Sequence, residues 1–235
     1  MFRRNVLAAI AAALVLVPFG AFGASPGEKM KIGIIGSGRI GGTLGELWAK
    51  AGHDVMFSSL DLEHDKQLAA KTGAKAGTPA QAAAYGDVLL VSVPYPALGQ
   101  IGRDYAASIK GKVVLDTSNP IPSRDGEMAV AAREKGTGVA SAEFLPGARL
   151  VRAFNAVGYG KLQSEHHRDG PRIAIALAAD DKQALDVAMK LVRDAGFEPV
   201  VVGGLATAKS FDVGSPVFGK ALTADELRKA LNIAQ

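Results

Sequence analysis

Short apolar runs alternate with longer amphipathic stretches along most of the chain. Continuous runs of valine, isoleucine and leucine are typical of strands buried on both faces of a parallel sheet. We predict strands at residues 31–35, 53–57, 74–76, 87–93, 112–116, 150–154, 171–178 and 197–202. Helices are predicted after the first strand and at residues 61–71, 79–84, 97–109, 126–136, 139–145, 181–195 and 223–231. Thr78 is expected to cap the helix at residues 79–84, and Thr223 with Glu226 three residues later predicts a capping box at the last helix.

This alternation of strands and helices predicts an α/β fold, with a Rossmann-type, doubly wound, mostly parallel sheet. The length of 235 residues is compatible with one or two domains. No linker or internal repeat divides the region after the amino-terminal segment. We therefore expect residues 30–235 to form a single compact domain.

The first predicted strand leads directly into a glycine-rich turn, Gly36-Ser37-Gly38-Arg39-Ile40-Gly41. In a dinucleotide-binding turn of this spacing, the first glycine permits the tight turn and the second lets the backbone approach a pyrophosphate. The third glycine lets the helix pack closely on the strand. The helix that follows carries Leu44, Leu47 and Trp48 on the same apolar face as Ile40, so Trp48 is expected in the core. All six turn residues are predicted to bind a dinucleotide; the alternative is a glycine turn kept only for packing.

Charge, histidine and cysteine content exclude several other classes of protein. The formal net charge is +4 and no basic stripe is interleaved with aromatic residues, so we predict no nucleic-acid partner. The absence of cysteine excludes disulfides, thiolate metal sites and a cysteine nucleophile. His166 and His167 lie in a polar stretch that we interpret as a solvated loop, and no metal site is predicted.

Residues 1–23 have the three parts of a secretory signal peptide. Arg3 and Arg4 lie in a short positive region, residues 6–17 form an alanine-rich apolar run, and small residues precede a cleavage point after Gly23. The run is shorter than the about 20 residues that a membrane-spanning helix needs, so no stable membrane insertion is expected after cleavage. The arginine pair also resembles a twin-arginine export signal, with ordinary signal-peptide charge as the alternative. We expect a periplasmic or secreted protein, or a cytoplasmic one if translation starts at Met30.

Four segments together resemble a known family: GIIGSGRIGGTLGELWAKAGHDVMFSS, LLVSVP, VVLDTSNPI and VRAFNAVG. They are similar to the NADP-dependent oxidoreductases of the deazaflavin coenzyme F-420 and to the cytosolic part of the six-transmembrane metalloreductases. The resemblance extends over about residues 30 to 205. It implies a compact single domain, NADP(H) as the cofactor, and hydride transfer to a flavin-like ring held opposite the nicotinamide.

The sequence departs from this family directly after the second predicted strand. The family commonly has an arginine there to hold the 2′-phosphate of NADP, whereas this chain has Leu60. Asp61 suits either a ribose 2′-hydroxyl, as in NAD-binding proteins, or the cap of the next helix. Arg39 suits either the 2′-phosphate or a place on the solvated surface. The resemblance therefore favours NADP, with NAD left open.

The remaining candidate residues follow the ends of strands, where ligands bind in such sheets. Besides the glycine turn, the residues predicted to contact the cofactor are Ser58, Ser59, Val93, Pro94 and Asn119, and those predicted to line the acceptor pocket are Asn119 and Asn155. Purely structural roles are open for Pro94 as a strand stop and for both asparagines as turn residues. Tyr95 is expected either to stack on a ring or to pack in the core. The acceptor ring is expected to lie across the strand ends, near both asparagines and residues 203–208.

The sequence shows no Ser-His-Asp set, no paired carboxylates and no metal cluster. This pattern is compatible with hydride transfer, in which the cofactor does the chemistry and the protein positions the reacting rings. We therefore expect an NAD(P)H-dependent oxidoreductase whose partner is a deazaflavin, a flavin or another small-molecule acceptor. A non-catalytic dinucleotide-binding sensor or partner subunit is the alternative. A homodimer is left open.

Overall fold

The computed structural model describes residues 29–233, which fold around one eight-stranded sheet. The strands are β1 (Lys31–Ile35), β2 (Asp54–Phe57), β3 (Lys75–Ala76), β4 (Val88–Val91), β5 (Val113–Asp116), β6 (Arg149–Arg152), β7 (Ala174–Ala178) and β8 (Glu198–Gly203). They lie in the order β3-β2-β1-β4-β5-β6-β7-β8, with β1 paired in parallel to both β2 and β4. This order confirms the predicted doubly wound, Rossmann-type α/β fold. The predicted signal peptide, residues 1–23, lies outside the described residues.

The direction of the sheet reverses between β6 and β7. The first six strands are mutually parallel, and β7 and β8 are parallel to each other. Between the two groups the pairing is antiparallel and consists of one residue pair, Arg152 with Ala178. The hydrogen-bonded ladder is therefore nearly interrupted at this point, and side chains must hold the two groups of strands together.

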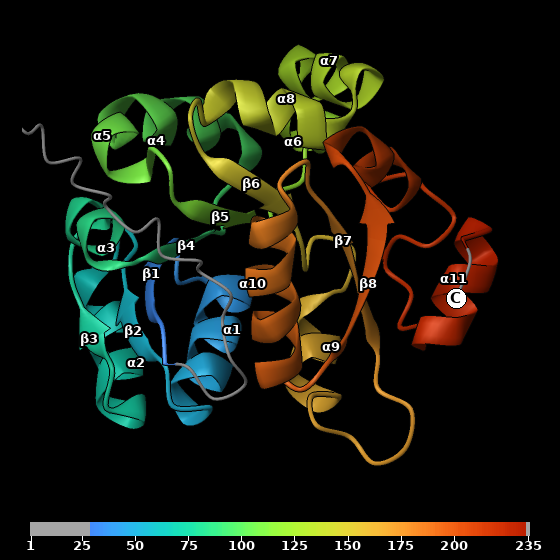
Figure 1. Ribbon diagram of the computed structural model, residues 1–235. Helices are drawn as coiled ribbons and strands as arrows, with labels where there is room; N and C mark the ends of the chain where they lie inside the picture. The colour runs from blue at the N-terminus through green and yellow to red at the C-terminus, as the bar shows by residue number, and fades with distance from the viewer. Residues whose placement is uncertain (1–28, 234–235) are drawn as a thin grey trace, which may run out of the picture.

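Helices cover both faces of the sheet. They are α1 (Arg39–Lys50), α2 (Leu62–Thr72), α3 (Pro79–Tyr85), α4 (Leu98–Asp104), α5 (Ala106–Ile109), α6 (Pro122–Asp125), α7 (Glu127–Lys135), α8 (Thr137–Phe144), α9 (Tyr159–Ser164), α10 (Lys182–Asp194) and α11 (Ala224–Leu231), with short 3₁₀ helices η1 (Tyr95–Ala97) and η2 (Leu205–Ser210). Because side chains alternate along a strand, Ile32 and Ile34 pack in one cluster with α1, α2 and α10. Ile35 packs in a second cluster with α4, α7 and α8, which lie above the sheet in Figure 1.

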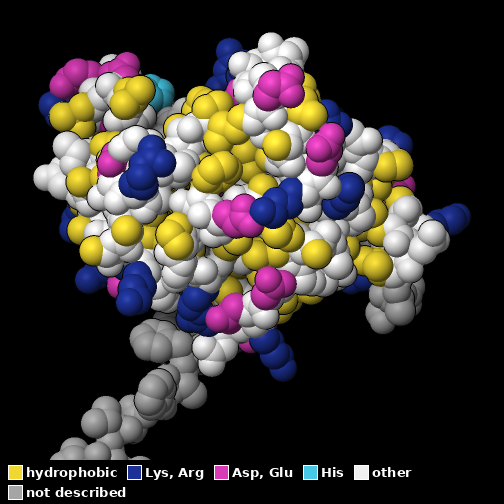
Figure 2. Space-filling model, turned by 90° about the horizontal axis from the view of Figure 1, so that it is seen from above, with side chains coloured by type: hydrophobic (Ala, Val, Ile, Leu, Met, Phe, Trp, Pro, Cys, Tyr) yellow, Lys and Arg dark blue, Asp and Glu magenta, His cyan; other side chains and the backbone are white. Residues whose placement is uncertain are grey.

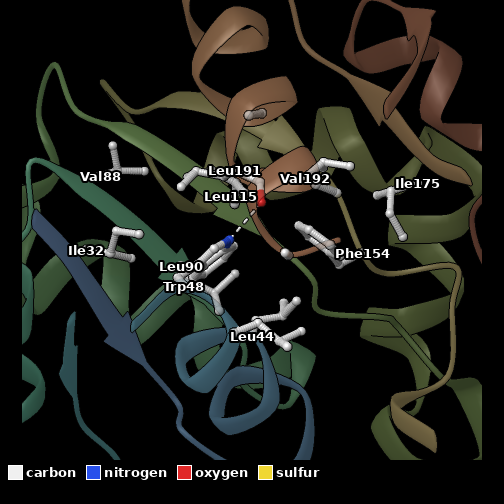
Figure 3. Close-up of a cluster of buried hydrophobic side chains, with 14 of the residues drawn as sticks. Ile32, Leu44, Trp48, Val88, Leu90, Leu115, Phe154, Ile175, Leu191 and Val192 are labelled. Carbon is white, nitrogen blue, oxygen red and sulfur yellow. Dashed lines mark hydrogen bonds between the residues drawn. The ribbon is translucent and has the colours of Figure 1, made fainter. Parts of the chain in front are cut away.

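Trp48 joins the two groups of strands through the core, as its apolar helix face predicts. It is fully buried, and its Nε1 donates a hydrogen bond to the carbonyl oxygen of Leu191 on α10 at 2.8 Å (Figure 3). The indole also meets the ring of Phe154 edge to face, with 6.0 Å between ring centroids. The helix after the glycine turn is thereby fixed to the helix that covers β7 and β8.

Several elements differ from the predicted ones. The single helix expected at residues 97–109 is divided into α4 and α5 at Tyr105, whose φ of −117° is not helical. The short helices α6 and α9 and both 3₁₀ helices were not predicted, because one or two turns carry too little periodicity to recognise. By contrast, the caps expected at Thr78 and Thr223 are confirmed, and both form capping boxes.

The outer surface of the upper helical layer carries charges of both signs. Figure 2 shows Lys and Arg side chains interspersed with Asp and Glu on this face. Within residues 29–233, no helix combines the length and the apolar character required to cross a membrane. The same residues contain no cluster of His, Asp and Glu arranged to hold a metal ion.

Candidate active site

A cleft of about 670 Å³ opens beside the glycine-rich turn between β1 and α1. Its walls are this turn, the segment after β2, and the segment that leads from β4 into α4. These segments follow the carboxyl ends of neighbouring parallel strands, where ligands bind in doubly wound sheets. The cleft is lined by six residues of the predicted cofactor set, namely Gly36, Ser37, Gly38, Ser59, Val93 and Pro94.

The three glycines of the turn differ in what an added side chain would meet. Gly36 has a φ of 98°, and an added Cβ would lie 2.3 Å from the carbonyl oxygen of Ser92. A Cβ on Gly41 would lie 2.1 Å from the carbonyl oxygen of Gly36. A Cβ on Gly38, in contrast, would have no atom within 4 Å. The packing of the protein therefore requires the first and third glycines, whereas the second leaves open space for a ligand.

The amino end of α1 offers backbone N–H groups to that space. Gly38 is the N-cap residue and no side chain caps the helix, and the first intrahelical bond runs from Gly42 N to Gly38 O at 2.7 Å. The N–H groups of residues 39–41 thus have no helical acceptor and lie at the positive end of the helix dipole. The N–H groups of Gly36 and Ser37 instead bind Ser58 O, at 2.8 and 3.0 Å. Residues 39–41 are therefore suited to hold a pyrophosphate, while the preceding residues fix the turn.

Two of the predicted cofactor serines point their hydroxyls into the protein. Ser58 is fully buried, and its hydroxyl donates to the carbonyl oxygen of Ile34. Ser37 is fully buried as well, and its hydroxyl donates to the buried carboxylate of Asp65. Ser59 donates to the same carboxylate at 2.9 and 3.0 Å but also lines the cleft. The Ser58 hydroxyl is thus committed to the β1 backbone, and a contact between Ser58 and the cofactor stays a prediction.

The outer end of the cleft lacks the arginine that the family has. Leu60 is fully exposed at the rim, and the carboxylate of Asp61 caps α2 by accepting from His64 N at 3.0 Å. The guanidinium of Arg39 lies 4.9 Å from the ring centroid of Tyr159, outside the set of lining residues. Sequence analysis missed His64, which lines the cleft with its Nε2 3.2 Å from Ser37 O. Among the described residues that line this cleft, His64 is the sole basic side chain.

The segment after β4 contributes Val93 and Pro94 to the cleft but not Tyr95. Pro94 lies immediately before η1, and Tyr95 turns into the core, where its ring meets that of Phe144 edge to face at 6.0 Å between centroids. Burial raises the pKa of the Tyr95 hydroxyl to about 12. Of the two roles left open for Tyr95, the structure therefore shows packing.

The two asparagines predicted for the acceptor pocket lie together. Asn119 Nδ2 donates to Asn155 O at 2.9 Å, and Asn155 Nδ2 donates to Asp212 Oδ1 at 2.9 Å. Both side-chain oxygens are buried and have no hydrogen-bond partner within residues 29–233. Since buried polar atoms are normally paired, these two oxygens are suited to accept hydrogen bonds from a ligand.

A buried ion-pair network, which sequence analysis missed, lies beside the asparagines. Arg152 is fully buried, with Nη1 donating to Asp116 Oδ2 at 2.7 Å and Nη2 donating to Asp212 Oδ1 at 2.8 Å. Burial by itself would lower the pKa of Arg152, but the two carboxylates hold it above its ordinary value. An arginine within the apolar run at residues 150–154 was the available signal.

Residues 203–208, expected beside the acceptor ring, pack mainly on α8. Leu205 O lies 2.5 Å from the position of an added Cβ on Gly138, and Leu205 N donates to Asp180 Oδ1 at 2.9 Å. Asp212, just after η2, is the residue that reaches the strand ends. Residues 203–208 are therefore neighbours of the site, and Asp212, which follows them in the chain, supplies the contact with Arg152 and Asn155.

This arrangement defines a class of protein. Proteins with an open glycine turn at a helix amino terminus in a Rossmann-type sheet bind a nicotinamide or flavin dinucleotide. Comparisons with known proteins narrow the class. Residues 31–120 match the family model described as NADP oxidoreductase, coenzyme F420-dependent. An F420-dependent NADP reductase from Methanothermobacter marburgensis is 31% identical over 205 residues, which cover 80% of this chain and 90% of the relative. The chain belongs to this family and is an oxidoreductase that uses a nicotinamide dinucleotide.

Two other proteins are similar over most of the chain. Metalloreductase STEAP3 from Rattus norvegicus is 26% identical over 196 residues, which cover 82% of this chain and 38% of the relative. The crystal structure of the hypothetical protein SMa0349 from Sinorhizobium meliloti has a TM-score of 0.73 at 24% identity, with 83% of this chain and 96% of that chain covered. The latter similarity supports the fold alone.

Proposed function

We propose that the protein transfers hydride between NADP(H) and a small planar acceptor of the deazaflavin or flavin type. The observation that carries the proposal is the adjacency of two sites. Val93 and Pro94, which follow β4, line the cofactor cleft, and Asn119 of the asparagine pair follows the neighbouring strand β5. The names of the relatives supply the reaction type and the acceptor class.

The residues of the chain serve binding and orientation. Residues 39–41 would hold the pyrophosphate by their N–H groups, Asn119 Oδ1 would accept from the carboxamide or the ribose, and Asn155 Oδ1 would accept from the acceptor. When bound, the nicotinamide supplies the hydride at C4, and solvent supplies the proton that completes a two-electron reduction. Positioning then dominates the rate, because the reacting atoms must lie roughly 3–3.5 Å apart.

Alanine at Asn119 or Asn155 is therefore expected to lower kcat by about tenfold to a hundredfold without abolishing turnover, which is the size of effect that misplacement produces. The measurement is steady-state kinetics with each variant, with circular dichroism to confirm that it folds. Complete loss of turnover in a folded variant would instead indicate a chemical role for that asparagine.

The test of the reaction uses NADPH carrying deuterium at C4, in each of its two stereoisomers. Acceptors to be offered are a deazaflavin, flavins, quinones and small carbonyl compounds. The proposal expects deuterium in one class of acceptor, from one stereoisomer only. Tight cofactor binding without turnover of any acceptor would instead favour the non-catalytic dinucleotide-binding module.

Discrimination between NADP(H) and NAD(H) is expected to be weak, since no Lys or Arg is among the described residues that line the cleft. Leu60→Arg should lower the Kd for NADPH about tenfold to a hundredfold, because a charge-assisted hydrogen bond contributes about 1.5–3 kcal/mol. The Kd for NADH should stay unchanged. Isothermal titration of both cofactors measures this, with Leu60→Gln as the uncharged control. Equal tightening for NADH would show that Leu60 does not lie near the 2′-position.

Export to the periplasm remains our proposal for location, supported by the signal-like pattern of residues 1–23. The mature chain should then begin near Ala24. Amino-terminal sequencing of protein recovered from its native cell checks this, and a chain that begins at Met1 or Met30 would exclude it.

A further inference from the structure

The buried ion-pair network around Arg152 contains one more negative charge than positive charge. The carboxylates of Asp116 and Asp212 share the single guanidinium of Arg152, at 2.7 and 2.8 Å. All three side chains are almost completely buried. Solvent therefore screens the extra negative charge poorly, and its field extends into the protein around it.

No second cation is paired with these carboxylates within residues 29–233. Arg152 forms the only salt bridge to either of them in that part of the chain, and Asp212 Oδ2 has no hydrogen-bond partner there. Arg133 and Lys209 line the same cavity as Asp212, but both side chains reach solvent, which screens their charges. The surplus negative charge is therefore not balanced locally.

The network lies one strand away from the cofactor cleft. Asp116 is the last residue of β5, and its partner in the parallel pairing with β4 is Val91. Ser92, the residue after Val91, lines the cleft. Since neighbouring strands are about 4.8 Å apart, the surplus charge lies close enough to act on a ligand in this cleft.

The network is also linked to the two asparagines. Asp212 Oδ1 accepts a hydrogen bond from Asn155 Nδ2, and Asn155 O accepts one from Asn119 Nδ2. The proposed function has the carboxamide or the ribose of the cofactor bind Asn119. The nicotinamide ring would then lie between the cleft and the buried network.

The nicotinamide ring changes its charge in the proposed reaction. Hydride leaves C4 with the electron pair of the broken C–H bond, so a neutral dihydropyridine ring becomes a pyridinium ring with one positive charge. A new bond forms between this hydride and the acceptor, and a proton from solvent completes the reduction. A nearby buried negative charge favours the positively charged form of a group over its neutral form.

We propose that the surplus negative charge of the Arg152 network stabilises the oxidised, cationic nicotinamide and so favours hydride donation by the cofactor. This inference rests on the proposed function, since it places the nicotinamide ring beside Asn119. A purely structural role would need one carboxylate to balance Arg152, because each further buried charge lowers stability. The second carboxylate, that of Asp212, is the charge assigned to the cofactor.

Asp212 can lose its charge without losing its hydrogen bonds. Its Oδ1 accepts from both Arg152 Nη2 and Asn155 Nδ2, whereas its Oδ2 has no partner within residues 29–233. In Asp212→Asn, the amide oxygen can take the place of Oδ1 and the amide nitrogen that of Oδ2. Asp116 is less suitable for such a change, because both of its carboxylate oxygens accept hydrogen bonds.

The experiment measures the Kd of the full protein for NADP⁺ and for NADPH by isothermal titration. Asp212→Asn should weaken binding of NADP⁺ about tenfold relative to NADPH, the effect of a unit charge at roughly 12 Å with an effective dielectric constant of about 20. For a two-electron couple, this change in ratio raises the midpoint potential of the bound cofactor by about 30 mV. A purely structural role would weaken binding of both forms alike and leave the ratio unchanged.

Asp181→Asn is the matched control. It also removes a carboxylate that pairs with an arginine, Arg149, but this pair is partly exposed. The ratio of the two Kd values should therefore stay unchanged in the control. A thermal melt of each variant confirms that it folds.

The wild-type protein offers a second measurement, which decides the matter even if Asp212→Asn does not fold. An analogue of NADP⁺ in which a benzamide ring replaces the nicotinamide ring has nearly the same shape but no ring charge. The wild type should bind NADP⁺ at least about tenfold more tightly than this neutral analogue. Asp212→Asn should reduce that difference.

An unchanged ratio of Kd values in folded Asp212→Asn would overturn the inference, as would equal binding of NADP⁺ and the benzamide analogue by the wild type. Deuterium transfer from NADPH to one class of acceptor, together with such a result, would leave the proposed function intact. A tenfold change in the ratio without hydride transfer to any acceptor would support the role of the charge and contradict the proposed function.

Discussion

Replacing Arg152 with methionine is expected to lower the free energy of unfolding by about 3–5 kcal/mol, the usual result of breaking a buried ion pair by removing one partner. The change leaves the carboxylates of Asp116 and Asp212 buried without a cation, at 0% and 6% side-chain exposure. It also removes the donor to Ser118 O. Equilibrium unfolding in urea measures the difference.

Arg149 provides a matched control on the same strand. It pairs with Asp181 at 2.7 Å, but the two side chains are 28% and 37% exposed. Arg149→Met should therefore cost less than about 1 kcal/mol, as is typical of solvent-screened pairs. Equal losses of unfolding free energy for Arg152→Met and Arg149→Met would show that burial does not increase the contribution of the Arg152 network to stability.

Replacing Gly38 with alanine is expected to weaken cofactor binding, whereas replacing Gly41 with alanine is expected to lower the stability of the protein. Gly38→Ala meets no protein atom within 4 Å, so the melting temperature should stay unchanged. Cofactor binding should weaken at least about tenfold, since a displaced pyrophosphate loses a charge-assisted hydrogen bond of about 1.5–3 kcal/mol. Gly41→Ala places a methyl 2.1 Å from Gly36 O and should cost about 1–3 kcal/mol of stability, as overpacking does.

Calorimetric titration of NADPH and thermal melts of both variants separate these effects. Alanine at Gly52, a loop position with a φ of 97° and nothing within 4 Å, is a useful third variant, because it strains the backbone away from the cleft. It should lower stability and leave the cofactor Kd unchanged. If Gly38→Ala bound NADPH as tightly as the wild type, the pyrophosphate would not lie over this turn.

The sequence predicted what depends on local pattern. The buried strands, the glycine turn and the caps at Thr78 and Thr223 follow from periodicity and from residues with special backbone preferences. Asn119 and Asn155 could be placed together because both follow the ends of strands that turned out to be neighbours.

The residues that were missed depend on contacts between distant segments. Asp212 meets Arg152 across 60 positions of sequence, and no local pattern marks Asp212 as part of a site. From the sequence, the hydroxyl of Ser58 was expected to reach a ligand, but in the structure it donates a hydrogen bond to Ile34 O. The reversal at β7 was not foreseen either, because an apolar run does not reveal the direction in which its strand enters the sheet.

The nearly interrupted ladder between β6 and β7 bears on how the protein tolerates substitution. Backbone hydrogen bonds form with almost any side chain, whereas this junction depends on particular ones, such as the Trp48 indole on Leu191 and the His53 ring on Asp194. Sequence drift should therefore be most restricted along the contact between α1 and α10, rather than within the central strands. The side chains that hold the two groups of strands together are therefore the ones that we expect to vary least.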